Sequence, residues 1–123
     1  MGRAPALDST NGDRERSAER VLAGGFVRLY ADRRQVFVRD REIHLTTKEF
    51  DLLHALLSAE GRVVTRDSIM ENIWKHREEL DLETRTLDVH MHRLRAKLGK
   101  EGERIITIKN VGYRFEFSLN QKT

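Results

Sequence analysis

The chain has 123 residues, of which 38% are hydrophobic, no cysteine and a formal net charge of +3. A chain of this length can bury one hydrophobic core but not two, and the lack of cysteine excludes disulfides and thiolate metal ligands. No apolar run approaches the roughly 18 residues of a membrane span, and no secretory signal is indicated at the N-terminus. We therefore expect one small domain, located in the cytoplasm and without contact to a membrane.

The N-terminal third is expected to contain a flexible segment followed by a small sheet. Residues 1–24 are rich in polar and charged residues and show no period that could bury one face, so we expect a flexible linker or tail. The folded domain is expected over residues 25–118, with a short tail over residues 119–123. Between residues 26 and 45, short β-prone runs alternate with turn residues, which predicts an antiparallel sheet of short strands.

Two capped helices are predicted after this sheet. Thr46 and Glu49 have the spacing of a capping box, and the helix that they open is expected to end at Gly61. After a short extended piece, Thr65 is placed to cap a second helix. Each helix repeats apolar side chains at three- and four-residue intervals, so each should bury one face. The inward side chains are Phe50, Leu53, Leu56 and Leu57 in the first helix and Ile69, Met70, Ile73 and Trp74 in the second.

The third helix, which Asp81 is placed to cap and which is expected to run to residue 98, combines an apolar stripe with a cationic face. Four apolar side chains fall within a narrow arc of the helical wheel, and that arc must be buried. The opposite arc and its flanks mix cationic and hydrogen-bonding groups with small apolar ones, which suits the major groove of DNA. The stripe is Leu87, Met91, Leu94 and Leu98, and the outward residues are Arg85, Thr86, Val89, His90, His92, Arg93, Ala96 and Lys97.

Positive charge is concentrated in this helix and the segment that follows it. Residues 84–114 contain eight Lys or Arg and three acids, a balance of about +5, whereas residues 67–83 carry six acids and two cations, about −4. A charged helix face is often only a solvated surface. The sharp segregation of charge along the chain nevertheless favours a nucleic-acid-binding face for residues 84–114.

A β-hairpin is predicted at the C-terminal end. Its first strand alternates Ile106 and Ile108 on one face with Thr107 and Lys109 on the other. The chain then turns over residues 110–112. The returning strand carries Tyr113, Phe115 and Phe117.

Four blocks of sequence occur in a defined order and spacing between about Gly25 and Phe117. They are L-T-T-K-E-F-D-L-L at 45–53, V-V-T-R-D-S-I-M-E-N-I-W at 63–74, R-T-L-D-V-H-M-H-R-L-R-A-K-L at 85–98 and V-G-Y-R-F at 111–115. Together they resemble the winged-helix effector domain of OmpR/PhoB-type bacterial response regulators. The resemblance implies an α+β winged helix-turn-helix with an N-terminal antiparallel sheet, three helices and a C-terminal hairpin as the wing. It also implies a sequence-specific DNA-binding transcriptional regulator.

The resemblance implies a role for individual residues on DNA. Arg93 would read a base in the major groove, with Val89 making an apolar contact beside it. Lys109 stands where the family commonly has Arg, so it keeps the charge but lacks the planar fork that suits a narrow minor groove. Contacts to phosphates are implied for Arg85, Thr86, His90, His92, Arg95 and the indole N–H of Trp74, with Lys97 on the flank, and contacts from the wing for Thr107, Lys109, Asn110 and Tyr113.

Four of these residues have a competing structural interpretation. Trp74 ends an amphipathic helix and is expected mainly in the core, an arrangement that still allows its N–H to face outward. Arg95 lies near the apolar stripe and near Asp88, so a pair within the helix is nearly as plausible as a DNA contact. Thr107 is an ordinary strand former, and Tyr113 fits the hairpin core equally well.

Partner proteins follow from the resemblance too. Family members usually carry a receiver domain before the linker, so a sensor kinase would act only through a receiver that this chain does not contain. The protein is expected to be a monomer in solution that binds direct-repeat operators as a tandem pair. In activators the loop between the second and third helices contacts RNA polymerase, although a plain connector is as plausible here. That loop comprises Lys75, His76, Arg77, Glu78, Glu79 and Leu80.

An enzymatic or metal-binding function finds no support in these motifs. His90 and His92 are two residues apart on a helix, so their side chains point about 160° apart and cannot share a metal ion. We expect no cofactor. The alternative that remains is a winged-helix module that contacts RNA polymerase and has weak or lost DNA binding.

Overall fold

A computed structural model describes residues 20–74 and 83–118 and begins with a four-stranded antiparallel sheet. Its strands pair in chain order and are β2 (Val21–Gly24), β3 (Val27–Tyr30), β4 (Gln35–Val38) and β5 (Arg41–Ile43). The predicted meander is therefore confirmed. Strand β2 is a correction, because the sequence placed residues 21–24 in the linker. Four residues are too few to show a period, but their backbone pairs with β3 from Val21 opposite Tyr30 to Gly24 opposite Val27.

Three α-helices follow within the described residues, and the caps predicted at Thr46 and Thr65 are confirmed. Helix α1 (Thr47–Ser58) has the full capping box: the Glu49 N–H donates to Thr46 Oγ1 and the Thr46 N–H donates to Glu49 Oε1. It ends at Ser58, three residues before the expected Gly61. Strand β6 (Val64–Thr65) leads into α2 (Arg66–Asn72), where Thr65 Oγ1 accepts from the Ser68 N–H. The long helix is α4 (Glu83–Leu98), and the expected cap at Asp81 lies outside the described residues.

The C-terminal sheet contains the wing. A 3₁₀ segment, η1 (Gly99–Arg104), connects α4 to strand β7 (Ile105–Ile108), which pairs with β8 (Gly112–Phe115), and β8 also pairs with β6. The alternation of the hairpin is as predicted: Ile106 and Ile108 are half-buried on one face, and Ile105 lies with Thr107 on the other face. The core side chains are Ile105, Tyr113 and Phe115, because this face of the hairpin packs against the helices.

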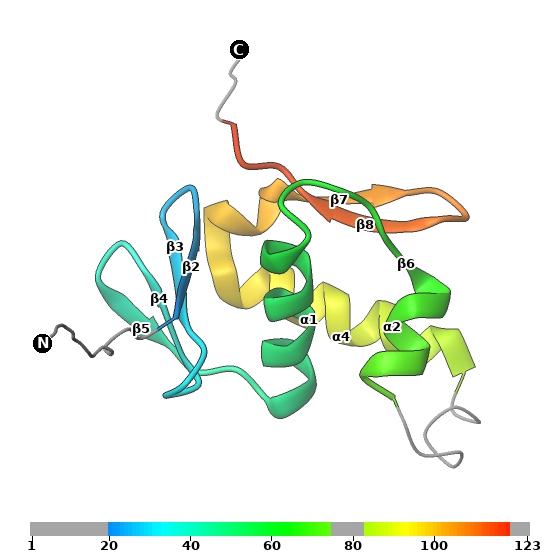
Figure 1. Cartoon of the computed structure of the whole chain (residues 1–123), viewed down its shortest axis with the longest axis horizontal. Coiled ribbons are helices and arrows are strands. Elements are labelled where there is room, and N and C mark those ends of the chain that lie inside the picture. The colour runs from blue at the N-terminus through cyan, green and yellow to red at the C-terminus, as the bar shows by residue number, and fades with distance from the viewer. Residues whose placement is uncertain (1–19, 75–82, 119–123) are drawn as a thin grey trace, which may run out of the picture.

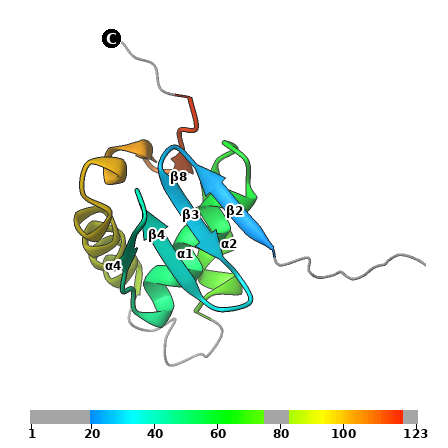
Figure 2. The same ribbon diagram turned by 90° about the vertical axis from the view of Figure 1, so that its left-hand side faces the viewer.

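The helices lie between the two sheets. Figure 1 shows β2 to β5 at one end of the molecule and the wing at the other, with α1 and α4 crossing between them. In the view of Figure 2 the four-stranded sheet lies in front of α1. One core joins all these layers, as the fully buried Leu29, Leu53, Leu94 and Phe115 show.

A buried ion pair joins the N-terminal sheet, η1 and the chain after β8. Arg104 Nε donates to Glu101 Oε1 at 2.7 Å, and the same oxygen accepts from the Phe26 N–H at 2.9 Å. Arg104 Nη1 also donates to the carbonyl oxygens of residues 116, 117 and 118. Gly25 has a φ of +59°, and a Cβ there would lie 2.2 Å from Arg104 Nε, so this junction requires glycine.

Candidate nucleic-acid interface

Helix α4 presents one apolar face to the core and one polar face to solvent. The predicted apolar stripe is confirmed, since Leu87, Met91, Leu94 and Leu98 are at most 2% exposed. On the opposite arc, Val89, His92, Arg93 and Ala96 are exposed. No acidic side chain lies among these four positions. Arg85 and Thr86 belong to α4, but their side chains lie outside the described part of the chain.

The flank of α4 that faces the wing is tied to it by hydrogen bonds. Arg95 donates to the Ile105 carbonyl oxygen from Nε at 3.2 Å and from Nη2 at 2.9 Å, and Nη2 also donates to Thr107 Oγ1 at 2.6 Å. Asp88 Oδ1 accepts from the Tyr113 hydroxyl and, at 3.0 Å, from Arg66 Nη1. The Arg95–Asp88 pair that the sequence left open is thus not formed, because each side chain reaches a partner in another element.

The pKa shifts of Tyr113 and Asp88 keep the phenol protonated as the donor and the carboxylate ionised as the acceptor. Burial raises the pKa of Tyr113, and its bond to the Asp88 carboxylate adds to that effect, so the phenol stays protonated and donates. Burial alone would raise the pKa of Asp88, but the hydrogen bonds from Arg66 and Tyr113 outweigh it and lower that pKa. The hydrogen bond to Asp88 raises the pKa of Arg66.

The other flank of α4 faces α1 and the end of α2. Lys97 Nζ donates to Glu49 Oε1 at 2.7 Å, and Glu49 is only 1% exposed. The His90 ring packs edge-on against Trp74, with 5.4 Å between the ring centroids. Trp74 is 2% exposed, which confirms the expectation that it belongs to the core. Burial lowers the pKa of His90, so its imidazole is neutral near pH 7.

Exposed cations occur on the open arc of α4, where Arg93 lies, and at the tip of the wing, where Lys109 lies. Lys109 and Asn110 are exposed, and Asn110 adopts a φ of +66° in a turn that is closed by the Val111 N–H donating to the Ile108 carbonyl at 2.9 Å. Arg93 forms no ion pair with another residue that the structure describes. Arg93 and Lys109 therefore have their donors available to a ligand.

The structure brings together some predicted site residues and gives others a different setting. Arg93, Val89 and His92 share the open arc, and Lys109 and Asn110 share the wing tip. Hydrogen bonds within the domain engage the polar groups of Arg95, Lys97, Thr107 and Tyr113. The loop over residues 75–80 lies outside the described residues.

Arg66 was missed as a site residue. It is the first residue of α2, its N–H donates to the Val111 carbonyl of the wing at 3.0 Å, and its guanidinium contacts Asp88 and Tyr113. No local pattern marks such a residue, since Asp88 and Tyr113 lie 22 and 47 residues further along the chain.

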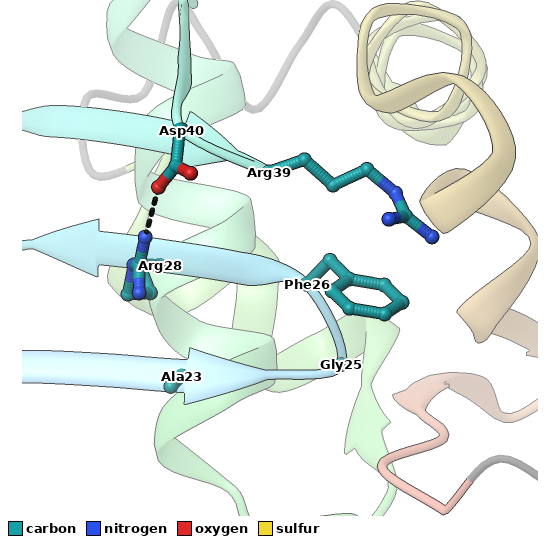
Figure 3. A pocket seen from close by; sticks show the side chains of 6 residues that line it. All are labelled: Ala23, Gly25, Phe26, Arg28, Arg39 and Asp40. Atoms are coloured by element: carbon teal, nitrogen blue, oxygen red, sulfur yellow. Dashed lines mark hydrogen bonds and ion pairs between the residues drawn. The ribbon is translucent and has the colours of Figure 1, made fainter.

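A second surface feature is a pocket of about 400 Å³ at the turn end of the N-terminal sheet. Figure 3 shows the Arg39 side chain reaching toward the Phe26 ring, and Arg28 bonded to Asp40 at 2.8 Å. These groups pair with one another. No cluster of three potential metal ligands occurs within residues 20–74 and 83–118. None of the helices of this described part is long and apolar enough to cross a membrane.

Several known proteins are similar to this chain. A family described as "Transcriptional regulatory protein, C terminal" matches residues 40–115. The "Probable transcriptional regulator ycf27" of Galdieria sulphuraria is 40% identical over 99 residues, which cover 78% of this chain and 39% of the relative. This chain therefore corresponds to less than half of that protein.

Two solved structures have the same fold. One is the RstA DNA-binding domain of Klebsiella pneumoniae in complex with the RstA box, with a TM-score of 0.70 and 29% identity over 80% of this chain and 99% of that one. The other is DrrB of Thermotoga maritima, an OmpR/PhoB homolog, with a TM-score of 0.68 and 31% identity over 78% of this chain and 44% of that one.

Proposed function

Because this chain belongs to the OmpR/PhoB-type family of C-terminal domains of transcriptional regulatory proteins, we propose that it binds double-stranded DNA and regulates transcription as the effector domain of a response regulator. The family regulates transcription rather than catalysing a reaction. The observation that best supports DNA binding is the exposed arc of α4, which carries Arg93 and His92 and no acid. The exposed Asp88 lies at the edge of that arc, where its charge is paired with Arg66, so a phosphate-rich ligand meets no unpaired like charge there.

In this proposal α4 enters the major groove and the wing lies against the adjacent minor groove. Arg93 is the base-reading residue, with Val89 beside it for apolar contact. Lys109 and Asn110 contact DNA from the wing tip. Arg85, Thr86 and His92 hold phosphates. The proposed domain comprises residues 20–118, which extends the expected boundary by five residues, Arg20 and the four residues of β2.

Selection of duplexes from a random pool by the purified domain, followed by substitution of Arg93, tests this function. Arg93→Ala should lower affinity for the selected site by about 1–3 kcal/mol, because a bidentate contact to a base is lost, while non-specific affinity falls much less. Equal losses on both kinds of DNA would make Arg93 a phosphate contact. A pool that yields no enriched sequence would contradict sequence-specific binding.

The regulatory setting is a proposal that rests on the relatives. The chain covers 39% of the ycf27 relative, so we propose that a receiver domain precedes it in the full protein and that a sensor kinase acts through that receiver. We propose a cytoplasmic location for the protein itself. On DNA, two copies would bind direct-repeat half-sites about one helical turn apart, about 10 base pairs.

Contact with RNA polymerase is proposed for the loop over residues 75–80, which lies outside the described residues. Its sequence is K-H-R-E-E-L, between α2 and α4. Replacing Glu78 and Glu79 by Lys should abolish activation in an in vitro transcription assay while DNA affinity stays equal or rises. Unchanged activation with intact binding would make the loop a connector or the protein a repressor.

A protein-interaction module with weak DNA binding is the alternative function. The exposed Val89 at the centre of the α4 arc, 39% exposed, is the observation that favours it, because an apolar side chain there suits a protein surface as well as a thymine methyl. A salt titration separates the two. Phosphate contacts impose a steep loss of affinity with rising salt, whereas an apolar protein contact does not.

A further inference from the structure

Three elements of the domain meet at the Tyr113 side chain. Tyr113 comes from β8 in the wing and is 3% exposed. Its hydroxyl donates to Asp88 Oδ1 of α4, and Arg66 Nη1 from the start of α2 donates both to that carboxylate oxygen at 3.0 Å and to the hydroxyl oxygen at 3.2 Å. A single polar cluster therefore connects the wing to α4 and to α2.

A second set of bonds joins the wing to α4 about two helical turns further along the helix. Arg95 donates three hydrogen bonds to β7, at the Ile105 carbonyl and the Thr107 hydroxyl. The guanidinium carbons of Arg66 and Arg95 lie 5.9 and 5.8 Å from the centroid of the Tyr113 ring. The ring is thus held by two cations and anchored through its hydroxyl.

None of these bonds requires a ligand. They exist within the domain, and they fix the wing relative to the helix that carries Arg93. Two points of attachment along α4, at Asp88 and at Arg95, restrain rotation of the hairpin as well as its distance from the helix. The tip of the wing, with Lys109, projects beyond both points.

We propose that Asp88 and Tyr113 are positioning residues that hold the wing in a fixed position relative to α4, so that the helix and the wing tip contact two adjacent grooves of DNA as one rigid body. This inference rests on the proposed function, because it concerns how the two reading elements are coupled. A wing that is already ordered loses little conformational entropy on binding, and its contacts then add to those of the helix.

A positioning role for Asp88 and simple electrostatics predict opposite effects of Asp88→Asn on DNA affinity. Asp88 is a negative charge with a side chain that is 55% exposed, on a helix proposed to bind phosphates. If charge alone mattered, Asp88→Asn would strengthen binding to every duplex. If Asp88 positions the wing, the same substitution weakens binding to the preferred site, because the wing must be ordered during binding.

The test compares Asp88→Asn and Tyr113→Phe with two matched controls. Tyr30→Phe removes the hydroxyl of the other tyrosine, in β3, and Glu103→Gln removes an exposed negative charge from η1. The probes are the duplex that the wild-type domain selects from a random pool and poly(dI-dC) as non-specific DNA. We expect each positioning variant to lower the ratio of the two affinities about tenfold, because Tyr113→Phe removes a hydrogen bond to a charged group and Asp88→Asn removes the charge of the acceptor that Tyr113 and Arg66 share. Both controls should keep the wild-type ratio.

Hydrogen exchange on the free protein gives a readout that does not depend on DNA. In both positioning variants the amides of β7 and β8 should exchange about tenfold faster, while those of β2 to β5 keep their wild-type rates. A uniform acceleration over both sheets would indicate general destabilisation and would overturn the proposal.

The remaining outcomes separate this inference from the proposed function. A wild-type domain that selects no duplex overturns the proposed function, and with it the coupling of grooves. Selection by the wild type with unchanged ratios in both positioning variants overturns the positioning role alone. A rise in affinity on both DNAs for Asp88→Asn, as for Glu103→Gln, would mean that Asp88 acts only through its charge. An equal loss on both DNAs for Tyr113→Phe would make its hydroxyl a phosphate contact.

Discussion

Replacing Lys97 by Met should destabilise the domain by leaving a buried carboxylate without its cation. Lys97 Nζ lies 2.7 Å from Glu49 Oε1, and the Glu49 side chain is 1% exposed while that of Lys97 is 38% exposed. Removing one partner of a fully buried pair costs about 3–5 kcal/mol. The partial exposure of Lys97 screens the pair, and the Thr46 N–H still donates to the carboxylate at 2.9 Å. We therefore expect a loss of about 1–3 kcal/mol in the free energy of unfolding at pH 7.

The pH dependence of this loss has a defined sign. Burial alone would raise the pKa of Glu49, but Lys97 and the capping bond hold it below the ordinary value of 4.5. In the wild type, Glu49 therefore stabilises the fold above its ordinary pKa, and this contribution is lost as the pH falls through the lowered pKa. In Lys97→Met, burial is opposed only by Thr46, so the pKa of Glu49 rises. The difference between the two proteins should thus be largest near neutral pH and shrink on acidification below about pH 5.

Urea unfolding followed by circular dichroism at pH 7 and pH 4 measures both effects. Lys100→Met is the matched control, because Lys100 carries the same charge just after α4 and is exposed. It should change the free energy of unfolding by less than about 0.5 kcal/mol. A difference between Lys97→Met and wild type that is absent at pH 7, or that grows on acidification, would refute the reasoning. Lys97 would then be an ordinary surface cation available to DNA.

Three further predictions concern the N-terminal junction, the wing and assembly. Gly25→Ala should lower the unfolding free energy by more than about 2 kcal/mol, because the added Cβ meets the buried Arg104 at a positive φ; thermal melting checks this, and an unchanged melting temperature would contradict it. Lys109→Ala should reduce the slope of log K against log salt by about one unit, since one phosphate contact is lost; an identical slope would place the wing off the DNA. Light scattering without DNA should give a monomer. A stable dimer would contradict the proposal that two copies assemble only on DNA.

Elements with a local signal could be predicted from the sequence. Thr46 and Thr65 mark the starts of α1 and α2, because each lies three residues before the backbone N–H that it caps. The apolar stripe of α4 follows from helical periodicity. Strand β2 could not, because a four-residue run becomes a strand only when β3 lies beside it. The choice of Ile105 over Ile106 for the buried face of β7 depends on the same kind of distant packing.

In the candidate site, too, residues with a local sequence signal could be predicted and residues positioned by distant contacts could not. The open arc of α4 could be read from the helical wheel, which places Arg93 opposite the buried stripe. The residues that fix the flanks could not be found in that way. Arg66 and Tyr113 are 47 positions apart, and Lys97 and Glu49 are 48 apart. Only the folded chain shows that side chains interpreted as DNA contacts also hold the helix in place.

These internal bonds reduce the positive charge of residues 84–114 that is available to DNA. Lys97, Arg104 and Arg114 each pair with a carboxylate of the domain, so their charges are largely cancelled. Arg95 is different, because its hydrogen bonds go to a neutral carbonyl and a hydroxyl.

Arg95 therefore keeps its positive charge while its donors are occupied. Such a cation attracts DNA through the long-range field without forming a phosphate bond of its own. Among the described cations of the segment, Arg93 and Lys109 are exposed on α4 and on the wing tip and have their donors available. Direct contact with DNA is thus expected from a few side chains at these two places, while Arg95 contributes to the rate of encounter and to the geometry of the wing.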